Sequence, residues 1–448
     1  MKLKRTLIKN AKIVNEGKVF GGDVLIENDT ITQIDDSISA KWADVKIIDA
    51  EGKHLLPGVI DDQVHFREPG LTHKATIETE SKAAIAGGIT SFIEMPNTNP
   101  QTTTLQNLEE KFVIASRTSF ANYSFMFGGT NDNLDDILKV DPTTVAGLKL
   151  FLGSSTGNML VDDPKVLKKI FESTNMLISV HCEDEATIKK NLEAHIKTYG
   201  ENIPIEKHPV IRSEEACYIS SSAAIELAKT TGARLHVFHL STAKETTLFT
   251  NAVPLKDKKI TAEVCIHHLW FTDEDYSQKG TFIKWNPAVK SKKDRAQLWK
   301  ALLDDRIDVI ATDHAPHTIA EKKNAYLNAP SGGPLVQHAL PAMLEMYHKN
   351  KISIEKIVEK MCHNPAILFQ IERRGYIKEG YFADMVLVDL NNPWTVKKEN
   401  ILYKCGWSPF EGATFKSRIT HTILNGELVF ENFKFGKIKA AKRLTFNR

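Results

Sequence analysis

The chain has 448 residues, of which 42% are hydrophobic and 25% are charged. This composition is typical of a folded globular protein and excludes an intrinsically disordered one. Its 58 basic and 56 acidic residues give a formal net charge of +2, which removes the electrostatic reason to expect a nucleic-acid or membrane-surface binder. The five cysteines form no CxxC pair, no signal peptide is recognisable, and no apolar run reaches the ~18 residues of a membrane helix. We therefore expect a soluble, cytoplasmic protein.

Short apolar runs recur along the chain, each ending in polar residues and followed by a longer segment. The runs are rich in Val, Ile, Leu and Phe and do not alternate strictly with polar residues, as expected for parallel strands buried on both faces. Parallel strands need crossover connections, and the intervening segments are long enough for crossover helices. Eight such runs occur, at residues 58–66, 90–95, 121–127, 145–152, 177–181, 234–239, 260–266 and 308–312.

One connecting segment shows the helical signals clearly. Ser213 precedes two acidic residues and is a suitable N-cap, while Gly232 supplies a stop at the C-terminal end. Between them Ile219 and Leu227 belong to a set of apolar residues at helical spacing, which predicts that they face the core. Eight strand–helix units in succession predict an α/β fold, a TIM-type (β/α)8 barrel over residues 56–373.

Both ends of the chain differ from this central part, because they are rich in short strands and turns. The dipeptide Asn425-Gly426 is a strong signal for a hairpin. The simplest arrangement has residues 1–55 and 374–448 build one small β-sandwich-like domain beside the barrel. From Lys434 onward the chain carries six basic residues and no acidic one, and we expect this basic tail to be solvated.

Reactive groups of such barrels lie at the C-terminal ends of the strands, so polar residues there are candidates. His65 ends the first run and lies on the same face as Gln63. Two roles remain open for it, that of a histidine in the core and that of a metal ligand. Lys149 lies in the apolar fourth run without a carboxylate beside it. Its stem could extend to the rim, or the amine could be deprotonated and carbamylated into a carboxylate that bridges two metal ions. Asp313 closes the eighth run, either as a turn cap or as a ligand and base.

Two further histidines complete the candidate set. His181 ends the fifth run, and the sixth run contains both His236 and His239. The last two have opposite parity along the strand, so only one can face the barrel axis. His239 lies nearer the C-terminal end and is the better candidate, which leaves His236 a structural role. Together these residues indicate a divalent-metal site, with histidines on strands one, five and six, a lysine on strand four and an aspartate on strand eight. Zinc favours this mixture of nitrogen and oxygen ligands.

With these residues in view, the chain resembles the metal-dependent amidohydrolases and, within them, the dihydroorotase family. The lysine, histidine and aspartate positions are shared across the wider family, whereas the Phe-Arg-Glu-Pro-Gly and Pro-Asn-Thr strings point to dihydroorotases. The similarity runs over nearly the whole chain. It rests on the strings VHFREPG at 64–70, MPNT at 95–98, GLKLF at 147–151, HHL at 267–269, WNP at 285–287, DHAPH at 313–317, ADMVL at 383–387 and SPFEG at 408–412.

The resemblance implies five metal ligands and four substrate-binding residues. The ligands of a binuclear zinc site would be His65, carbamylated Lys149, His181, His239 and Asp313. The substrate-binding residues would be Arg67, Asn97, Asn286 and His317, the first two at the free carboxylate of the substrate. A guanidinium is well matched to that task because it forms a bidentate fork with a carboxylate.

One position departs from the family pattern. The first histidine of the usual His-x-His motif is Gln63 here, and a neutral amide oxygen is a poor zinc ligand compared with imidazole. We expect the metal position that His65 shares with Asp313 to be weakened, so that one or two zinc ions bind per chain. The roles of His267 and His268 stay open, and the loop at 331–334 is expected near the barrel mouth.

The reaction implied by the resemblance is the reversible ring closure of N-carbamoyl-L-aspartate to L-dihydroorotate and water, a step of de novo pyrimidine biosynthesis. In the hydrolytic direction zinc would supply hydroxide at neutral pH, and Asp313 would carry the proton of that water to the leaving amide nitrogen. Two alternatives stay open: a relative acting on dihydropyrimidines, hydantoins or allantoin, and a catalytically inactive dihydroorotase-like scaffold subunit. The expected partner is the small-molecule substrate, with neither nucleic acid nor membrane, and a homo-oligomer is left open.

Overall fold

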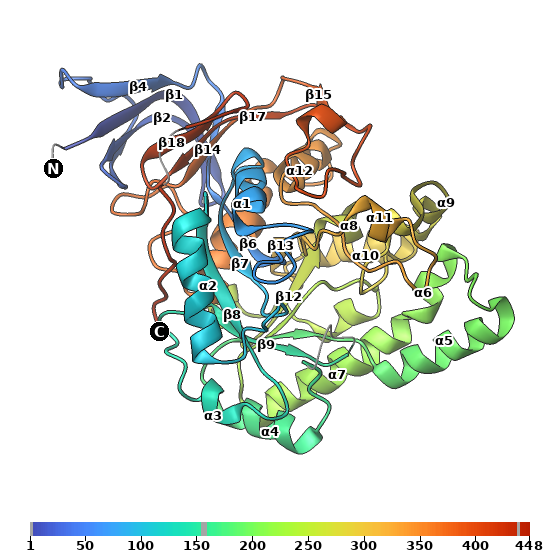
Figure 1. Ribbon diagram of the computed structural model, residues 1–448. Helices are drawn as coiled ribbons and strands as arrows, with labels where there is room; N and C mark the ends of the chain where they lie inside the picture. The colour runs from blue at the N-terminus through green and yellow to red at the C-terminus, as the bar shows by residue number, and fades with distance from the viewer. Residues whose placement is uncertain (1–2, 154–158, 437–439) are drawn as a thin grey trace.

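The computed structural model describes residues 3–153, 159–436 and 440–448. Its centre is a barrel of eight parallel strands surrounded by helices, and a second sheet built by the two chain ends lies beside it (Figure 1). Neighbouring strands of the barrel are also neighbours along the chain, as successive right-handed crossovers require. The barrel strands are β6 (Val59–Val64), β7 (Ile89–Glu94), β8 (Asn122–Gly128), β9 (Gly147–Phe151), β10 (Ile178–His181), β11 (Leu235–Val237), β12 (Ile260–Cys265) and β13 (Val309–Ala311).

The first and last of these strands close the barrel. Val64 forms a parallel bridge with His314, and the amide of His65 donates to the carbonyl of His314 at 2.7 Å. The hydroxyl of Thr312 also donates to the carboxylate of Asp61, at 2.6 Å. Closure therefore brings the segments that follow β6 and β13 side by side at the C-terminal end of the barrel.

Helices connect most of the barrel strands and cover their outer face. Among the described residues, none of these helices is both long and apolar enough to cross a membrane. The α-helices are α1 (Ile77–Ala86), α2 (Leu105–Thr118), α3 (Leu134–Ile137), α4 (Pro164–Ser173), α5 (Glu185–Tyr199), α6 (His208–Ile211), α7 (Glu214–Thr231), α8 (Ile266–Trp270), α9 (Tyr276–Lys279), α10 (Lys292–Leu303), α11 (Ile319–Lys322), α12 (Ala339–His348), α13 (Ile354–Val358) and α14 (Asn364–Phe369).

The connection between β11 and β12 differs from the expected crossover helix. Every residue of this connection is described, and its only helical parts are two short 3-10 turns, Glu245–Leu248 and Leu255–Asp257. The prediction of a helix was wrong here because the segment is rich in Ser and Thr, which favour turns, and because Pro254 cannot continue a helix.

Helix α7 begins and ends where the sequence predicts. The hydroxyl of Ser213 caps its first turn, and Gly232 ends it with a φ of 76°. The predicted buried face was wrong, however, since Ile219 is 40% exposed. The helix instead turns its small residues inward, where Ser221 donates a hydrogen bond to the buried Glu245 at 2.8 Å. The buried residues of α7 are Ala216, Cys217, Ser220, Ser221, Ala224, Ile225 and Ala228.

The second sheet confirms that both chain ends build one β structure. Its order is β19-β18-β17-β14-β5-β1-β2-β3, with β4 also paired to β1, so that β5 from the N-terminal part lies against β14 from the C-terminal part. Asn425 and Gly426 form the predicted hairpin turn between β17 and β18, with φ values of 47° and 79°. The strands outside the barrel are β1 (Arg5–Asn15), β2 (Lys18–Glu27), β3 (Thr30–Asp35), β4 (Val45–Asp49), β5 (His54–Pro57), β14 (Met385–Asp389), β15 (Trp394–Thr395), β16 (Thr414–Phe415), β17 (Arg418–Leu424), β18 (Glu427–Glu431) and β19 (Lys434–Phe435), of which β15 and β16 pair only with each other.

The C-terminal segment is packed against the barrel, and the expectation of a solvated tail was wrong. Leu444 is fully buried and Phe446 is 4% exposed, while Thr445 between them is exposed. The amide of Leu444 donates to the carbonyl of Tyr123 in β8 at 2.9 Å. This period-two alternation places two apolar side chains inward, and burial of apolar area outweighs the positive charge around them. Residues 437–439, which carry two of the tail's lysines, lie outside the described residues.

Candidate active site

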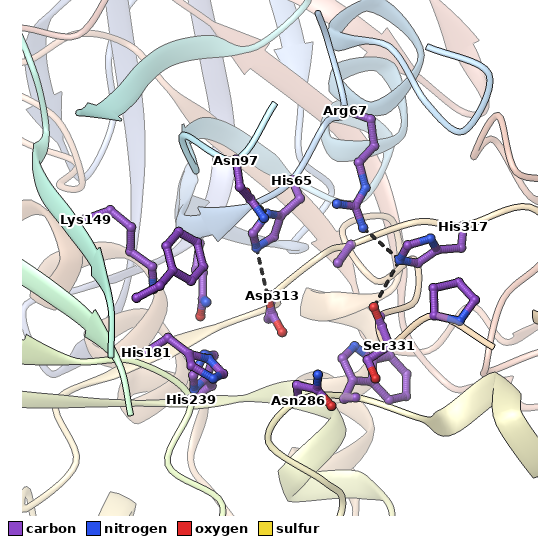
Figure 2. Close-up of a pocket in the computed structure, with 16 residues that line it drawn as sticks. His65, Arg67, Asn97, Lys149, His181, His239, Asn286, Asp313, His317 and Ser331 are labelled. Carbon is purple, nitrogen blue, oxygen red and sulfur yellow. Dashed lines mark hydrogen bonds and ion pairs between the residues drawn. The ribbon is translucent and has the colours of Figure 1, made fainter. Parts of the chain in front are cut away.

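A cavity of about 220 Å³ lies at the C-terminal ends of the barrel strands (Figure 2). It is also lined by Gln63, Phe151, Trp285 and the loop at 330–332, which confirms the expected place of that loop near the barrel mouth. The structure brings together all nine residues predicted for the site: His65, Arg67, Asn97, Lys149, His181, His239, Asn286, Asp313 and His317. Their individual roles stay predictions.

Three of these residues follow strand ends in a left-handed backbone conformation. The φ values are 68° for Arg67, 41° for His239 and 48° for Asp313. Such conformations cost a non-glycine residue about 1 kcal/mol or more, and they are concentrated at functional sites. Here they turn the side chains from the strand direction into the cavity.

His181 and His239 form a facing pair. Nδ1 of His181 lies 3.0 Å from Nε2 of His239, and both rings are buried. On its other side His181 places Nε2 3.0 Å from Glu183, whose carboxylate also contacts Arg212. Burial opposes ionisation of Glu183, but Arg212 outweighs it and lowers the pKa of Glu183 to about 2. An ionised Glu183 holds the proton of His181 on Nε2 and leaves the lone pair of Nδ1 toward His239.

His65 and Asp313 form a second pair on the facing side of the cavity (Figure 2). Nε2 of His65 lies 3.2 Å from the Oδ1 atom of Asp313, and its Nδ1 lies 2.8 Å from the amide oxygen of Asn97. Burial, opposed mainly by the nearby Lys149, raises the pKa of Asp313 to about 7. Asp313 can therefore gain or lose a proton near neutral pH.

Lys149 extends from β9 into the same cavity. Its side chain is 1% exposed, and its Nζ lies 4.8 Å and 4.3 Å from the ring centroids of Phe151 and Phe238. Among the described residues, no carboxylate or carbonyl oxygen is hydrogen-bonded to this Nζ. Burial lowers the pKa of Lys149 to about 7, so a large fraction of the amine is neutral at physiological pH. A neutral amine is the form that can react with carbon dioxide.

Arg67 and His317 occupy the other end of the cavity. Lys74 donates to Nδ1 of His317 at 3.0 Å, so the remaining proton of a neutral His317 lies on Nε2, 3.0 Å from the carbonyl of Ser331. Nη2 of Arg67 lies 3.0 Å from the same Nε2. Because that nitrogen carries the proton, it cannot accept a hydrogen bond from Arg67. Burial, followed by the charge of Arg67, holds the pKa of His317 well below its usual range, which keeps the ring neutral.

Other histidines lie outside the cavity lining. His239 lines the cavity, whereas His236 is buried outside the lining with its Nδ1 2.9 Å from the hydroxyl of Thr261. The expectation that only one of the two faces the barrel axis was wrong, because β11 ends at Val237 and the backbone turns at His239, with a φ of 41°. His267 stacks on Trp285, with ring centroids 4.3 Å apart, and His268 lies 3.1 Å from the carbonyl of Pro287. Both residues thus support the segment that carries Asn286.

Three residues that lie around the site are not among those predicted from the sequence: Lys74, Glu183 and Arg212. Glu183 follows His181 by two residues and shares its strand parity, a signal that could have identified it. Arg212 and Lys74 lie in connections far along the chain, and no local pattern marks them.

Asp62, His236 and Glu263 form another group of donor atoms, outside the cavity lining. Their potential ligand atoms lie within 4.8 Å of one another, the only such group of three or more His, Cys, Asp or Glu residues in the described parts of the chain. The cavity donors are arranged as two separate pairs instead.

Comparisons with known proteins show the family to which the chain belongs. The amidohydrolase family matches residues 54–429. The curated dihydroorotase of Carboxydothermus hydrogenoformans is 35% identical over 439 residues, covering 96% of this chain and 99% of that protein. The dihydroorotase of Staphylococcus epidermidis is 33% identical over 439 residues, covering 96% of this chain and 100% of that protein.

Among solved structures, the L-hydantoinase (dihydropyrimidinase) of Arthrobacter aurescens superposes with a TM-score of 0.93 at 28% identity, covering 98% of this chain and 99% of that chain. The dihydropyrimidinase of Brevibacillus agri has the same fold, with a TM-score of 0.87 at 24% identity and coverage of 99% and 100%. The family match and the donor groups of metal-binding composition together support a metal cofactor.

Proposed function

The chain belongs to the amidohydrolase family and, within it, to the dihydroorotases, and on this premise we propose that it interconverts N-carbamoyl-L-aspartate and L-dihydroorotate in de novo pyrimidine biosynthesis. The reaction closes or hydrolyses a cyclic amide. Its proposed location is the cytosol, whose reducing conditions suit the five buried thiols.

The buried Arg67 is the observation that carries this choice of substrate. Its side chain lies against a cavity, and the residue is only 6% exposed. Among the described residues, no carboxylate forms an ion pair with it. A buried guanidinium without a counter-ion is costly, and an anionic group of a substrate relieves that cost. Burial lowers the pKa of Arg67 only to about 10, so it stays charged at neutral pH.

The donor set of the cavity fits a divalent metal. Burial, followed by the nearby His181, holds the pKa of His239 well below its usual range, so the imidazole is neutral and can offer a lone pair. His181 offers Nδ1 beside it, and Asp313 adds a carboxylate. We propose one or two zinc ions per chain, held by these residues with His65 and with Lys149 in its carbamylated form.

The residues of the chain divide the work of the reaction. When bound, the metal lowers the pKa of a water molecule and polarises the amide carbonyl. In hydrolysis the water oxygen bonds to the ring carbonyl carbon, and Asp313 accepts the proton of that water. Asp313 then delivers the proton to the ring nitrogen as the carbon–nitrogen bond breaks. Ring closure follows the same steps in reverse.

Residues on the other side of the cavity orient the substrate. Arg67 and Asn97 hold the free carboxylate, and His317 lies beside them as a neutral ring. The amide oxygen of Asn286 is buried without a hydrogen-bond partner among the described residues, so it can accept an N–H group of the substrate. We expect these contacts to orient the cyclic amide toward the metal-binding donors.

A substrate panel tests the proposal. Purified protein supplied with zinc is assayed with L-dihydroorotate, N-carbamoyl-L-aspartate, dihydrouracil, hydantoin and allantoin. We expect turnover of the first two to dominate, because only they carry the carboxylate that Arg67 would bind. The similarity to L-hydantoinase favours a second candidate, a cyclic amidohydrolase for neutral rings, and faster turnover of hydantoin or dihydrouracil would establish it.

The Arg67→Ala variant tests whether Arg67 binds the substrate carboxylate. Loss of a charged hydrogen bond of about 1.5–3 kcal/mol should reduce kcat/KM for L-dihydroorotate by roughly 10- to 100-fold, mainly through KM. The exposed Arg373→Ala serves as the matched control and should have no effect. A metal-loaded protein that turns over no member of the panel would favour the inactive scaffold.

A further inference from the structure

The group formed by Asp62, His236 and Glu263 lies in the barrel interior, on β6, β11 and β12. All three side chains are completely buried. Nε2 of His236 lies 3.5 Å from Oδ2 of Asp62 and 3.8 Å from Oε2 of Glu263. None of the three lines the cavity of the candidate active site.

The surroundings of His236 fix which nitrogen faces the carboxylates. The hydroxyl of Thr261 donates to the carbonyl of Leu235 at 3.2 Å, so it can only accept from Nδ1 of His236, 2.9 Å away. A proton therefore sits on Nδ1. In the neutral ring Nε2 then presents its lone pair to two carboxylates.

Four polar atoms of this group lack a hydrogen-bond partner among the described residues. They are both carboxylate oxygens of Asp62, Oε2 of Glu263 and Nε2 of His236. Two apolar rings lie beside His236, since the ring centroids of Phe238 and Phe369 are 5.2 Å and 6.0 Å from that of His236. The second oxygen of Glu263, by contrast, accepts from the backbone amide of His239 and from Cys265. Buried atoms this polar need a positive partner.

The spacing and the charge of the group indicate what that partner is. Distances of 3.5 Å and 3.8 Å are long for hydrogen bonds but close to the separation of two donors that each lie about 2.0–2.2 Å from a shared ion. Burial opposes protonation of His236, but the carboxylates of Asp62 and Glu263 outweigh it and raise its pKa to about 9, so a bound cation has to replace a proton on the ring. With that proton gone, two carboxylates and one neutral imidazole carry a charge of −2, which a divalent cation neutralises. A mixture of imidazole and carboxylate donors favours zinc over calcium or magnesium.

We propose that Asp62, His236 and Glu263 bind a second, structural divalent cation of the zinc type, separate from the metal of the candidate active site. Such an ion ties β6, β11 and β12 together inside the barrel. Protons are the competing occupants, because protonation of His236 and of one carboxylate would neutralise the same group.

Anomalous diffraction decides between the two occupants. Crystals of the wild-type protein grown with zinc chloride are measured above and below the zinc absorption edge. We expect an anomalous peak between Nε2 of His236 and the two carboxylates, in addition to density in the cavity. A cavity peak with no peak at this group would overturn the inference and leave the proposed function intact. A peak at this group, with no metal in the cavity and no turnover, would support the inference and contradict the proposed function.

Metal analysis of variants supplies an independent measurement. Asp62→Asn should bind about one zinc equivalent per chain less than the wild type while keeping its cavity metal. The matched control is Asp61→Asn, whose side chain contacts Thr312 instead of the group and which should keep the equivalent. Equal zinc content in the wild type and Asp62→Asn would contradict the proposal. If Asp62→Asn does not fold, the wild-type crystals still decide.

Discussion

At the scale of single residues, burial determines the chemistry of the candidate site. Lys149 and Asp313 ordinarily titrate far from neutrality, yet burial brings the pKa of each to about 7. His65 and His239 are kept neutral by the same effect. A site assembled from groups that change protonation near neutral pH is suited to proton transfer and to metal binding.

Replacement of Asp313 by Asn tests its role in proton transfer. The amide keeps the size of the side chain but cannot accept the proton of the attacking water, so we expect kcat to fall by at least about 10³-fold. The fold and much of the bound metal should be retained, as measured by circular dichroism and metal analysis. The exposed Asp132→Asn is the control. Turnover close to the wild-type rate in Asp313→Asn would place the base elsewhere.

Replacement of Gln63 by His tests the departure from the family motif. Gln63 lines the cavity, and its amide oxygen lies 3.8 Å from the Sγ atom of Cys265. Imidazole is a better zinc ligand than an amide, so the zinc content should rise by up to one equivalent per chain. Gln63→Ala removes the amide without adding a ligand and should bind no more zinc than the wild type. Unchanged zinc content in Gln63→His would show that the position does not contact metal.

At the scale of secondary-structure elements, local signals determine where elements begin and end, but not which face they bury. Helix α7 has the predicted caps, yet it packs its small residues inward and leaves Ile219 exposed. The C-terminal segment has a basic composition, yet Leu444 and Phe446 are buried against the barrel. In both cases the neighbouring element selects the face that is buried.

Truncation of Leu444 tests the packing of the C-terminal segment. A fully buried leucine replaced by alanine loses apolar burial and leaves a cavity, so Leu444→Ala should lower the free energy of unfolding by about 2–5 kcal/mol. Leu138, which is 53% exposed, is the control, and Leu138→Ala should change the free energy of unfolding by less than about 0.5 kcal/mol. Urea unfolding measures both. Equal stability of the two variants would mean that the segment is solvated after all.

The turn after α10 gives a prediction on pH. Burial opposes ionisation of Asp305, but hydrogen bonds from Lys356 and Lys360, both at 2.8 Å, lower its pKa to about 2. Because the folded-state pKa lies below the ordinary 3.8, the stabilisation is present above pH ~4 and is lost as the pH falls toward 2. The side chain is half exposed, so the contribution is at most about 1 kcal/mol.

Urea unfolding of Asp305→Asn across the pH range measures this contribution. The difference in unfolding free energy from the wild type should stay constant between pH 7 and pH 5 and shrink below pH 4. The exposed Asp132→Asn again serves as the control, with no difference expected at any pH. A difference for Asp305→Asn that persists unchanged at pH 3 would contradict the ion-pair explanation.

At the scale of the whole molecule, part of the second sheet packs into the hydrophobic core of the barrel, while sheet residues such as Ile8 and Leu387 form a separate buried cluster. Val386 and Ile419 of the sheet belong to the same buried cluster as Ile85 and Leu340 of the barrel helices. A polar connection adds to it, since Asn122 of β8 donates to Asp384 at 3.0 Å. The boundaries at 55/56 and 373/374 therefore mark changes of architecture, and their status as separate folding domains stays a prediction.

This shared core predicts one cooperative unfolding transition. Calorimetry and far-UV circular dichroism should give the same midpoint, since neither part can lose its partner without exposing the common core. Asp384→Ala should lower that midpoint without splitting the transition. Two resolved transitions in the wild type would show that the barrel and the sheet unfold independently.

The sequence by itself determined the barrel, the pairing of the chain ends and five of the residues that meet in the cavity, while the other four, Arg67, Asn97, Asn286 and His317, came from the resemblance to a known family. These features depend on local patterns: apolar runs bounded by polar ends, a hairpin dipeptide, and short motifs such as DHAPH at 313–317. Closure of the barrel then brings strand ends together whatever their separation along the chain.

Only the tertiary structure decided the contacts between side chains that no local pattern relates. It placed Arg212 against Glu183, left Arg67 without a carboxylate partner, and gathered Asp62 with His236 and Glu263. Periodicity assigns a side chain to a face, but which other side chains share that face depends on the stagger of the strands and on backbone turns such as the one at His239. Those are properties of the closed barrel, and no single segment of the sequence contains them.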